Sequence, residues 1–313
     1  MHTLVVACPF VPVSSGLCCD ESVSDNQPGQ LRAVAEQLAA EAAKFVRRRR
    51  AEIFGDSPDV MGSDSVRTGL VQTKSTPTDP VTVVDTETEL LLRDRLNALR
   101  PGDSILGEEG GGPAGGEHGT VCWVLDPIDG TVNFVYDIPA YAISIAAQVA
   151  GVSVAGAVAD VVSGEVYSAA VGQGAHVLRP DGQRQALRCT RVDELSMALV
   201  GTGFGYAPQR RAAQAALLAQ MLPQVRDIRR IGSAALDLCM VAAGRLDAHY
   251  EHGLHVWDWA AGALVAAEAG ALTVLPAGDG IGDDAGVLVA AAPGIGAALL
   301  DALERFGGLR PLP

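Results

Sequence analysis

Two carboxylates three residues apart, Asp126 and Asp129, stand in the segment WVLDPIDGTVNFVY, which spans Trp123–Tyr136. Carboxylates held this close repel each other, and one of them would take up a proton unless a cation neutralised the pair. A hard divalent cation such as Mg²⁺ prefers oxygen ligands of this kind. An Asp-Gly pair is also common in turns, and Asp often caps a helix. By itself the segment therefore leaves a metal site and a structural turn open.

The residues before Asp126 predict how the pair is positioned. Val121–Leu125 is an apolar run, which predicts a buried strand that ends at Asp126. Pro127 fixes φ and has no backbone N–H, so we expect the strand to stop there. Asp129 would then lie in the turn that follows, close to the first acid.

Three further acids follow apolar runs in the same way. They are Asp85 after VTVV, Glu108 after SILG, and Asp258 inside HVWDWA. The ends of strands are where α/β proteins place their chemistry. Each acid alone is as well explained as a cap or a surface residue, and Asp258 could simply cap a helix. Together with Asp126 and Asp129 they would supply five oxygen side chains, a set suited to two or three Mg²⁺ ions.

The elements that must position these acids indicate an α/β fold. Apolar spacing predicts helices over Gln30–Phe54 and Thr86–Leu99. Short apolar or alternating runs between residues 142 and 178 predict an antiparallel sheet. Helices and strands alternate from residue 209 to residue 306. We expect residues 1–28 to form a disordered extension, and 29–313 to form one catalytic unit of two packed lobes, about 29–185 and 186–313.

Composition limits the classes of function. The 313 residues are 48% hydrophobic and carry a formal net charge of −14. An acidic chain is a poor candidate for binding nucleic acid directly or for attraction to an anionic membrane. The sequence contains no run of 18 apolar residues, so no transmembrane helix is expected. The six cysteines form no CxxC pair, so a reducing cytoplasm is the expected compartment.

With these motifs in view, the chain resembles the inositol monophosphatase family, of the bacterial SuhB type. Trp123–Tyr136 is similar to the first acidic signature of that family, and WDWAAGALVAAEAGA, Trp257–Ala271, to the second. Lys74–Asp85 and Gly107–Glu109 resemble two further family segments in the same order. The resemblance implies an α/β (α+β) fold, a layered αβαβα sandwich. It also implies Mg²⁺ dependence, lithium sensitivity and a homodimer.

The resemblance also implies roles for single residues in metal binding. The first metal would be held by Glu108, Asp126 and the carbonyl oxygen of Ile128. The second would be held by Asp126, Asp129 and Asp258, so that Asp126 bridges the two.

Catalytic and substrate roles follow from the same resemblance. Thr131 with Asp85 would position the attacking water, helped by Glu108. The N–H groups of Gly130 and Thr131 would hold the phosphate at the start of a helix. Lys74 would stand on a loop over the site. The alcohol would contact Ala234, Glu251 and Asp258, with 201–204 near its pocket.

The implied reaction is hydrolysis of a phosphate monoester by metal-activated water, with myo-inositol 1-phosphate as the expected substrate. Glu251 favours a polyhydroxylated ring, because a carboxylate accepts hydrogen bonds from hydroxyl groups. Related enzymes that act on histidinol phosphate, fructose 1,6-bisphosphate or phosphoadenosine phosphate are the alternatives. A SuhB-like adaptor in transcription antitermination is an alternative of another class.

Three histidines near Glu251 raise the possibility of zinc. They are His249, His252 and His255. Their spacing of three with no fourth partner favours strand-end or surface histidines instead.

Overall fold

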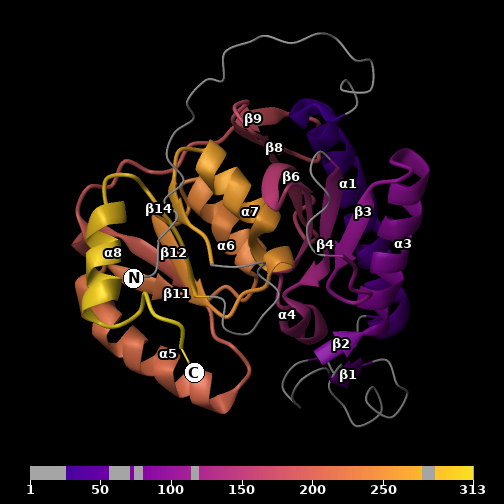
Figure 1. Ribbon diagram of the computed structural model, residues 1–313. Helices are drawn as coiled ribbons and strands as arrows, with labels where there is room; N and C mark the ends of the chain where they lie inside the picture. The colour runs from indigo at the N-terminus through magenta and orange to yellow at the C-terminus, as the bar shows by residue number, and fades with distance from the viewer. Residues whose placement is uncertain (1–25, 56–70, 74–79, 114–119, 277–285, 313) are drawn as a thin grey trace.

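In the computed structural model, the two larger of three β-sheets alternate with three layers of helices (Figure 1). The structure describes residues 26–55, 71–73, 80–113, 120–276 and 286–312. Helices α1 (Pro28–Phe54) and α3 (Val83–Leu99) form one outer layer. Helices α6 (Ala234–Ala242) and α7 (Val256–Glu268) lie between the sheets. The predicted αβαβα sandwich is therefore confirmed.

The larger sheet has seven strands in the order β3-β4-β5-β6-β7-β8-β9. Their bounds are β3 Ser104–Gly107, β4 Val121–Asp129, β5 Ala142–Val149, β6 Val152–Asp160, β7 Val166–Ala170, β8 Ala175–Leu178 and β9 Arg184–Ala186. β3 and β4 are parallel, and every later neighbour is antiparallel. The antiparallel sheet expected between residues 142 and 178 is thus present. One face of this sheet packs against α1 and the other against α7.

The smaller sheet has five strands in the order β11-β10-β12-β14-β13. Their bounds are β10 Leu199–Thr202, β11 Asp227–Arg229, β12 Ala248–His252, β13 Leu272–Val274 and β14 Val287–Ala291. Helices α5 (Pro208–Met221) and α8 (Gly296–Arg305) form the outer layer beside it (Figure 1). Three clusters of apolar side chains form the core, one for each layer of helices where it packs against the sheets. The middle layer of helices, α6 and α7, is packed between the two larger sheets, and this packing fixes the position of Asp258 on α7.

Helix starts differ from the sequence-based expectation in two places. α1 begins at Pro28 rather than Gln30, since proline at the first helical position loses no hydrogen bond and has a helical φ. α3 begins at Val83 rather than Thr86, after the short strand β2 (Pro80–Thr82), which pairs with β1 (Val71–Thr73). The predicted disordered extension, residues 1–28, lies outside the described residues up to residue 25, and Pro28 belongs to α1.

Within the described part of the chain, no helix combines the length and the apolar character that crossing a membrane requires.

Candidate active site

A bulge in β4 brings the first two acids to the same face of the large sheet. The strand does not stop at Pro127 but continues to Asp129, so the prediction of a turn was wrong. Asp126 pairs with Ser144 and Asp129 with Ala142, which leaves one extra residue on β4. Such a bulge accommodates Pro127, which cannot donate to the ladder. Since side chains alternate along a strand, residues three apart face opposite sides unless an extra residue intervenes.

The packing shows the same change of face. Before the bulge, Leu125 points into the core beside α1, whereas Val124 points toward α6 and α7. After the bulge, Ile128 returns to the α1 side despite its even number. Asp126 and Asp129 therefore both face the middle helices.

The remaining acids reach this place from different elements. Glu108 directly follows β3, and its N–H donates to the carbonyl of Leu125 at 3.1 Å. Asp258 is the third residue of α7, where its carboxylate accepts from the N–H of His255 at 2.7 Å. Asp85 is the third residue of α3 and accepts from the N–H of Thr82 at 2.9 Å. The expectation that Asp85 ends a strand is therefore wrong, because it lies in the first turn of α3, whereas Asp258 lies in the first turn of a helix, as the alternative of a helix cap predicted.

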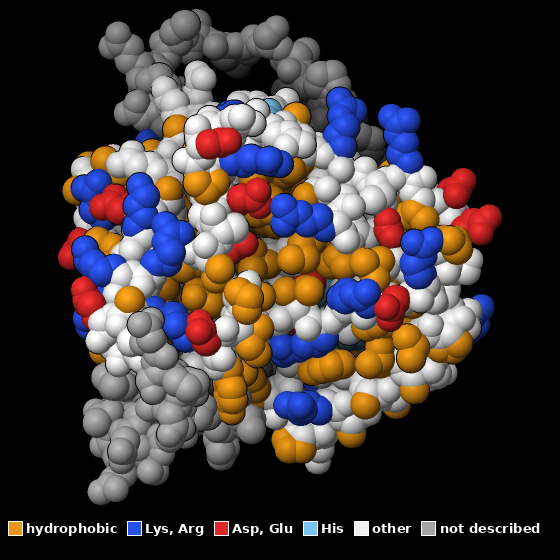
Figure 2. Space-filling view, turned by 180° about the vertical axis from the view of Figure 1, so that it is seen from behind, with side chains coloured by type: hydrophobic (Ala, Val, Ile, Leu, Met, Phe, Trp, Pro, Cys, Tyr) orange, Lys and Arg blue, Asp and Glu red, His pale blue; other side chains and the backbone are white. Residues whose placement is uncertain are grey.

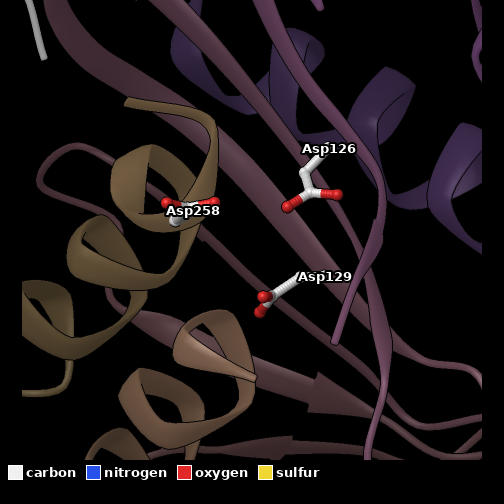
Figure 3. A group of neighbouring side chains, drawn as sticks. All are labelled: Asp126, Asp129 and Asp258. Carbon is white, nitrogen blue, oxygen red and sulfur yellow. The ribbon is translucent and has the colours of Figure 1, made fainter. Parts of the chain in front are cut away.

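Three of the acids form a compact cluster. Carboxylate oxygens of Asp126, Asp129 and Asp258 all lie within 4.8 Å of one another. Figure 3 shows the two side chains from β4 facing the one from α7 across a small space. Glu108 belongs to the same surroundings, because it acts electrostatically on both Asp126 and Asp258. An all-oxygen donor set of this kind fits a hard divalent cation, so the residues present suit Mg²⁺.

Burial and mutual repulsion raise the pKa of these carboxyls. The pKa of Asp126 lies well above its usual range because of burial, then because of Glu108, Asp129 and Asp258. Burial raises the pKa of Asp129 to about 7, although hydrogen bonds from Ser233 and Ala235 oppose the shift. The pKa of Asp258 is raised by burial and by Asp129. Without a cation the cluster is therefore electrostatically unfavourable, which agrees with a metal-binding role.

A second group of hydrogen bonds joins α3 to the start of α4 (Thr131–Tyr136). The hydroxyl of Thr131 lies 3.1 Å from Oδ1 of Asp85 and 3.1 Å from the carbonyl oxygen of Ile128. Asp85 is fully buried, and burial raises its pKa to about 7. The structure thus brings Thr131 and Asp85 into contact, beside the bulge that carries the cluster.

A cavity of about 530 Å³ opens onto the acids. Most residues with an expected site role line it: Glu108, Asp126, Ile128, Asp129, Gly130, Thr131, Ala234, Glu251 and Asp258. Gly130 has a φ of 96°, and a Cβ there would lie 3.0 Å from two backbone carbonyl oxygens, so glycine is needed at this turn. Asp85 is not among the lining residues, although it contacts Thr131. Lys74 lies outside the described residues.

Several residues at the cavity were not predicted from the sequence. Ser233 donates to Asp129 at 2.6 Å and caps α6. Arg210 and Arg230 also line the cavity. They come from distant elements, so no local spacing connects them to the acids; only the position of Ser233 before a helix is a recognisable signal.

The histidines also differ from the expectation. His249 and His252 are buried, with exposed fractions of 0% and 3%, so neither is a surface histidine, although His252 is a strand-end residue as expected. His252 ends β12, and its Nε2 lies 2.7 Å from the carbonyl oxygen of Gly308. His255 stacks on Trp257. Among the described residues, none of the three belongs to a cluster with the geometry of a metal site.

Comparisons with known proteins agree with this site. The sequence model of the inositol monophosphatase family matches residues 27–306 of this chain. The inositol-1-monophosphatase of Mycobacterium leprae (strain TN) is 69% identical over 294 residues, 93% of this chain and 99% of that protein. The solved structure named Mycobacterium tuberculosis SuhB has 62% identity and a TM-score of 0.76, and the match covers 91% of this chain and 100% of that chain. The Nus factor SuhB of Pasteurella multocida (strain Pm70) is 36% identical over 239 residues, 76% of this chain and 87% of that protein.

Proposed function

The chain belongs to the inositol monophosphatase family, and we propose on that premise that it hydrolyses myo-inositol 1-phosphate to inositol and phosphate with Mg²⁺. It is a phosphatase of this family. The observation that carries the proposal is the convergence of Asp126, Asp129 and Asp258 at the cavity. The relative from M. leprae bears the name of this activity.

The proposed metal ligands are those that the cavity presents. Glu108, Asp126 and the carbonyl of Ile128 would hold one Mg²⁺, and Asp126, Asp129 and Asp258 a second, with two or three ions in all. When bound, Mg²⁺ supplies Lewis-acid chemistry, because it acidifies water and neutralises the charge that builds up on phosphate and leaving oxygen. The chain needs no Ser, Cys or His nucleophile for this reaction. The N–H groups of Gly130 and Thr131 would bind the phosphate.

Thr131 and Asp85 would hold the attacking water. The hydroxyl of Thr131 has a single hydrogen and two acceptors at 3.1 Å, so its lone pairs stay free to accept from a water. We expect Thr131→Val to lower kcat by about 10²-fold, the lower range for groups that direct a proton in catalysis. Thr131→Ser should restore most of the activity. Steady-state kinetics on variants with unchanged thermal melts would check this, and a fully active Val variant would contradict it.

The leaving alcohol would lie against Ala234 and Glu251, with Asp258 also in contact. A panel of kcat/KM values at saturating Mg²⁺ tests this specificity. The panel should contain inositol 1-phosphate, histidinol phosphate, fructose 1,6-bisphosphate and phosphoadenosine phosphate. We expect inositol 1-phosphate to be preferred over histidinol phosphate by at least about tenfold, because a site that pairs a carboxylate with hydroxyl groups rejects alcohols that lack them. A clear preference for another monoester would replace the substrate but leave the metal chemistry in place.

Assembly and location complete the proposal. Figure 2 shows hydrophobic side chains gathered across the middle of one face, with Lys and Arg side chains around them. Contiguous apolar patches of this kind often mark interfaces, which supports a homodimer.

The cysteines that the structure describes are free, and this supports a reducing, cytoplasmic location. Lithium sensitivity and a single catalytic unit of two packed lobes are further parts of the proposal.

The adaptor alternative has support of one kind. A relative with 36% identity is named a Nus factor. The acidic cluster itself has a use in catalysis but none in a purely structural adaptor, so catalysis is the favoured function. An inactive variant distinguishes the two roles, since full rescue of a cellular phenotype by Asp126→Asn would indicate the adaptor role.

A further inference from the structure

A buried imidazole stands directly behind the carboxylate that faces the cavity. His249 and Glu251 are two residues apart on β12, so their side chains share one face of the strand. Nε2 of His249 lies 3.4 Å from Oε2 of Glu251. His249 is 0% exposed, whereas the Glu251 side chain is 11% exposed and lines the cavity. Glu251 therefore touches the cavity on one side and His249 on the other.

Asp237 closes the far side of the imidazole. This residue of α6 is almost fully buried, and its Oδ2 lies 3.8 Å from Nδ1 of His249. Gly201 on β10 leaves room for the pair, because a Cβ there would lie 2.9 Å from Asp237 Oδ1 and 3.0 Å from His249 Nδ1. Three elements thus cooperate to place an imidazole between two carboxylates.

These buried groups are not fully satisfied. Within the described residues, three buried atoms have no hydrogen-bond partner: Nδ1 and Nε2 of His249, and Oδ1 of Asp237. The contacts of 3.4 and 3.8 Å are close enough for electrostatic attraction but lack the geometry of hydrogen bonds. Buried polar atoms without partners are uncommon, and each one calls for an explanation. Apolar residues would fill this space at lower cost if packing were the only purpose.

The orientation of the Glu251 carboxylate depends on the residues around it. Its carboxylate lies against Gly203, where an added Cβ would lie only 2.0 Å from Oε1, so side-chain space on that flank exists only because residue 203 is glycine. A carboxylate with several rotatable bonds loses rotamer freedom when it binds hydroxyl groups. An imidazole behind the carboxylate reduces that loss, because electrostatic attraction across the 3.4 Å contact already restricts the side chain before the substrate arrives.

We propose that His249, held by Asp237, is a positioning residue that orients Glu251 for the hydroxyl groups of the substrate. The proposal rests on the proposed function, in which Glu251 contacts the leaving alcohol. Binding of a hydroxyl group would draw the two side chains into a hydrogen bond from Nε2–H to the carboxylate. Electrostatics agree: burial lowers the pKa of His249, but Asp237 and Glu251 outweigh burial and raise it above its usual value.

Two substrates separate positioning from a structural role. Inositol 1-phosphate offers ring hydroxyls to Glu251, whereas 4-nitrophenyl phosphate offers none. At saturating Mg²⁺ we expect His249→Phe to raise KM for inositol 1-phosphate by about tenfold, the loss typical of a hydrogen bond to a charged group. Its kcat, and both constants for 4-nitrophenyl phosphate, should change by less than about twofold. His249→Gln keeps a donor near the place of Nε2 and should recover most of the affinity.

Controls make each result decisive. Tyr250→Phe removes a buried hydroxyl from the opposite face of β12, outside the cavity lining, and should leave both substrates unaffected. If the Phe variant does not fold, His249→Asn, whose amide is too short to reach Glu251, replaces it. Equal losses for both substrates, or no change with inositol 1-phosphate, would overturn the proposal. A wild-type protein that hydrolyses only 4-nitrophenyl phosphate would instead refute the proposed substrate.

Discussion

Replacing Asp126 with Asn is expected to lower kcat/KM for inositol 1-phosphate by about 10³-fold or more. This carboxylate faces Glu108, Asp129 and Asp258, so it is the proposed bridge between two metal ions. Metal ions contribute several kcal/mol of transition-state stabilisation, and about 1.4 kcal/mol corresponds to a factor of ten in rate. A neutral amide keeps one oxygen but loses the charge that attracts the cations.

The fold should survive this change. Oδ1 of Asp126 accepts from the N–H of Ile128 at 3.0 Å, and the amide oxygen of Asn can accept the same hydrogen bond. Without metal the variant should even gain stability, since one buried like charge is removed. Asp160→Asn is the matched control, because Asp160 ends β6 of the same sheet but does not line the cavity. Activity of the Asp126 variant within a few-fold of wild type, at equal thermal stability, would refute the metal assignment.

How far the sequence predicts this site depends on how each acid is held. The family resemblance carried by the ordered motifs was sufficient to predict the layered fold, and four of the five acids that it indicated line the cavity: Glu108, Asp126, Asp129 and Asp258. The bulge at Pro127 was not predictable, because periodicity along one strand does not reveal the register of its partner. An isolated proline therefore suggested a strand end, whereas pairing with β5 carries the strand on to Asp129.

Helix caps account for the positions of Asp85 and Asp258. Asp85 and Asp258 follow apolar residues, and in a short window an apolar run before an acid fits a strand end as well as a first helical turn. The capping boxes that hold them depend on Thr82 and His255, and a histidine is an unusual cap. His249 could not be placed from its neighbours at all, because its partners include Asp237 on another element. Tertiary contacts, rather than local pattern, decide these positions.

The metal-free protein is expected to lose stability as pH rises from about 4 to about 7, and Mg²⁺ should reverse the loss. Burial raises the pKa of Asp85 and of Asp129 to about 7, against 3.8 for an ordinary Asp. In this range the folded state keeps protons that the unfolded chain has released, so the free energy of unfolding falls as pH rises. Above about pH 7 this contribution to the slope ends. Glu36 and Glu165, whose pKa values are lowered, act in the opposite sense but below pH 4.5.

Mg²⁺ should bind the ionised cluster, so its stabilising effect should grow over the same range. Binding of a ligand at about 100 times its Kd adds about 2.7 kcal/mol to the free energy of unfolding. Thermal melts with a chelator and with Mg²⁺, between about pH 5 and about pH 8, would check the two slopes. Calorimetry in buffers of different ionisation enthalpy should detect proton release below pH 7, since the ligands must lose their protons. The double variant Asp126→Asn with Asp129→Asn should show neither the Mg²⁺ effect nor the full pH slope. A wild-type protein whose chelated form melts at the same temperature across this range would show that these carboxyls do not share the raised pKa values on which the metal-site argument depends.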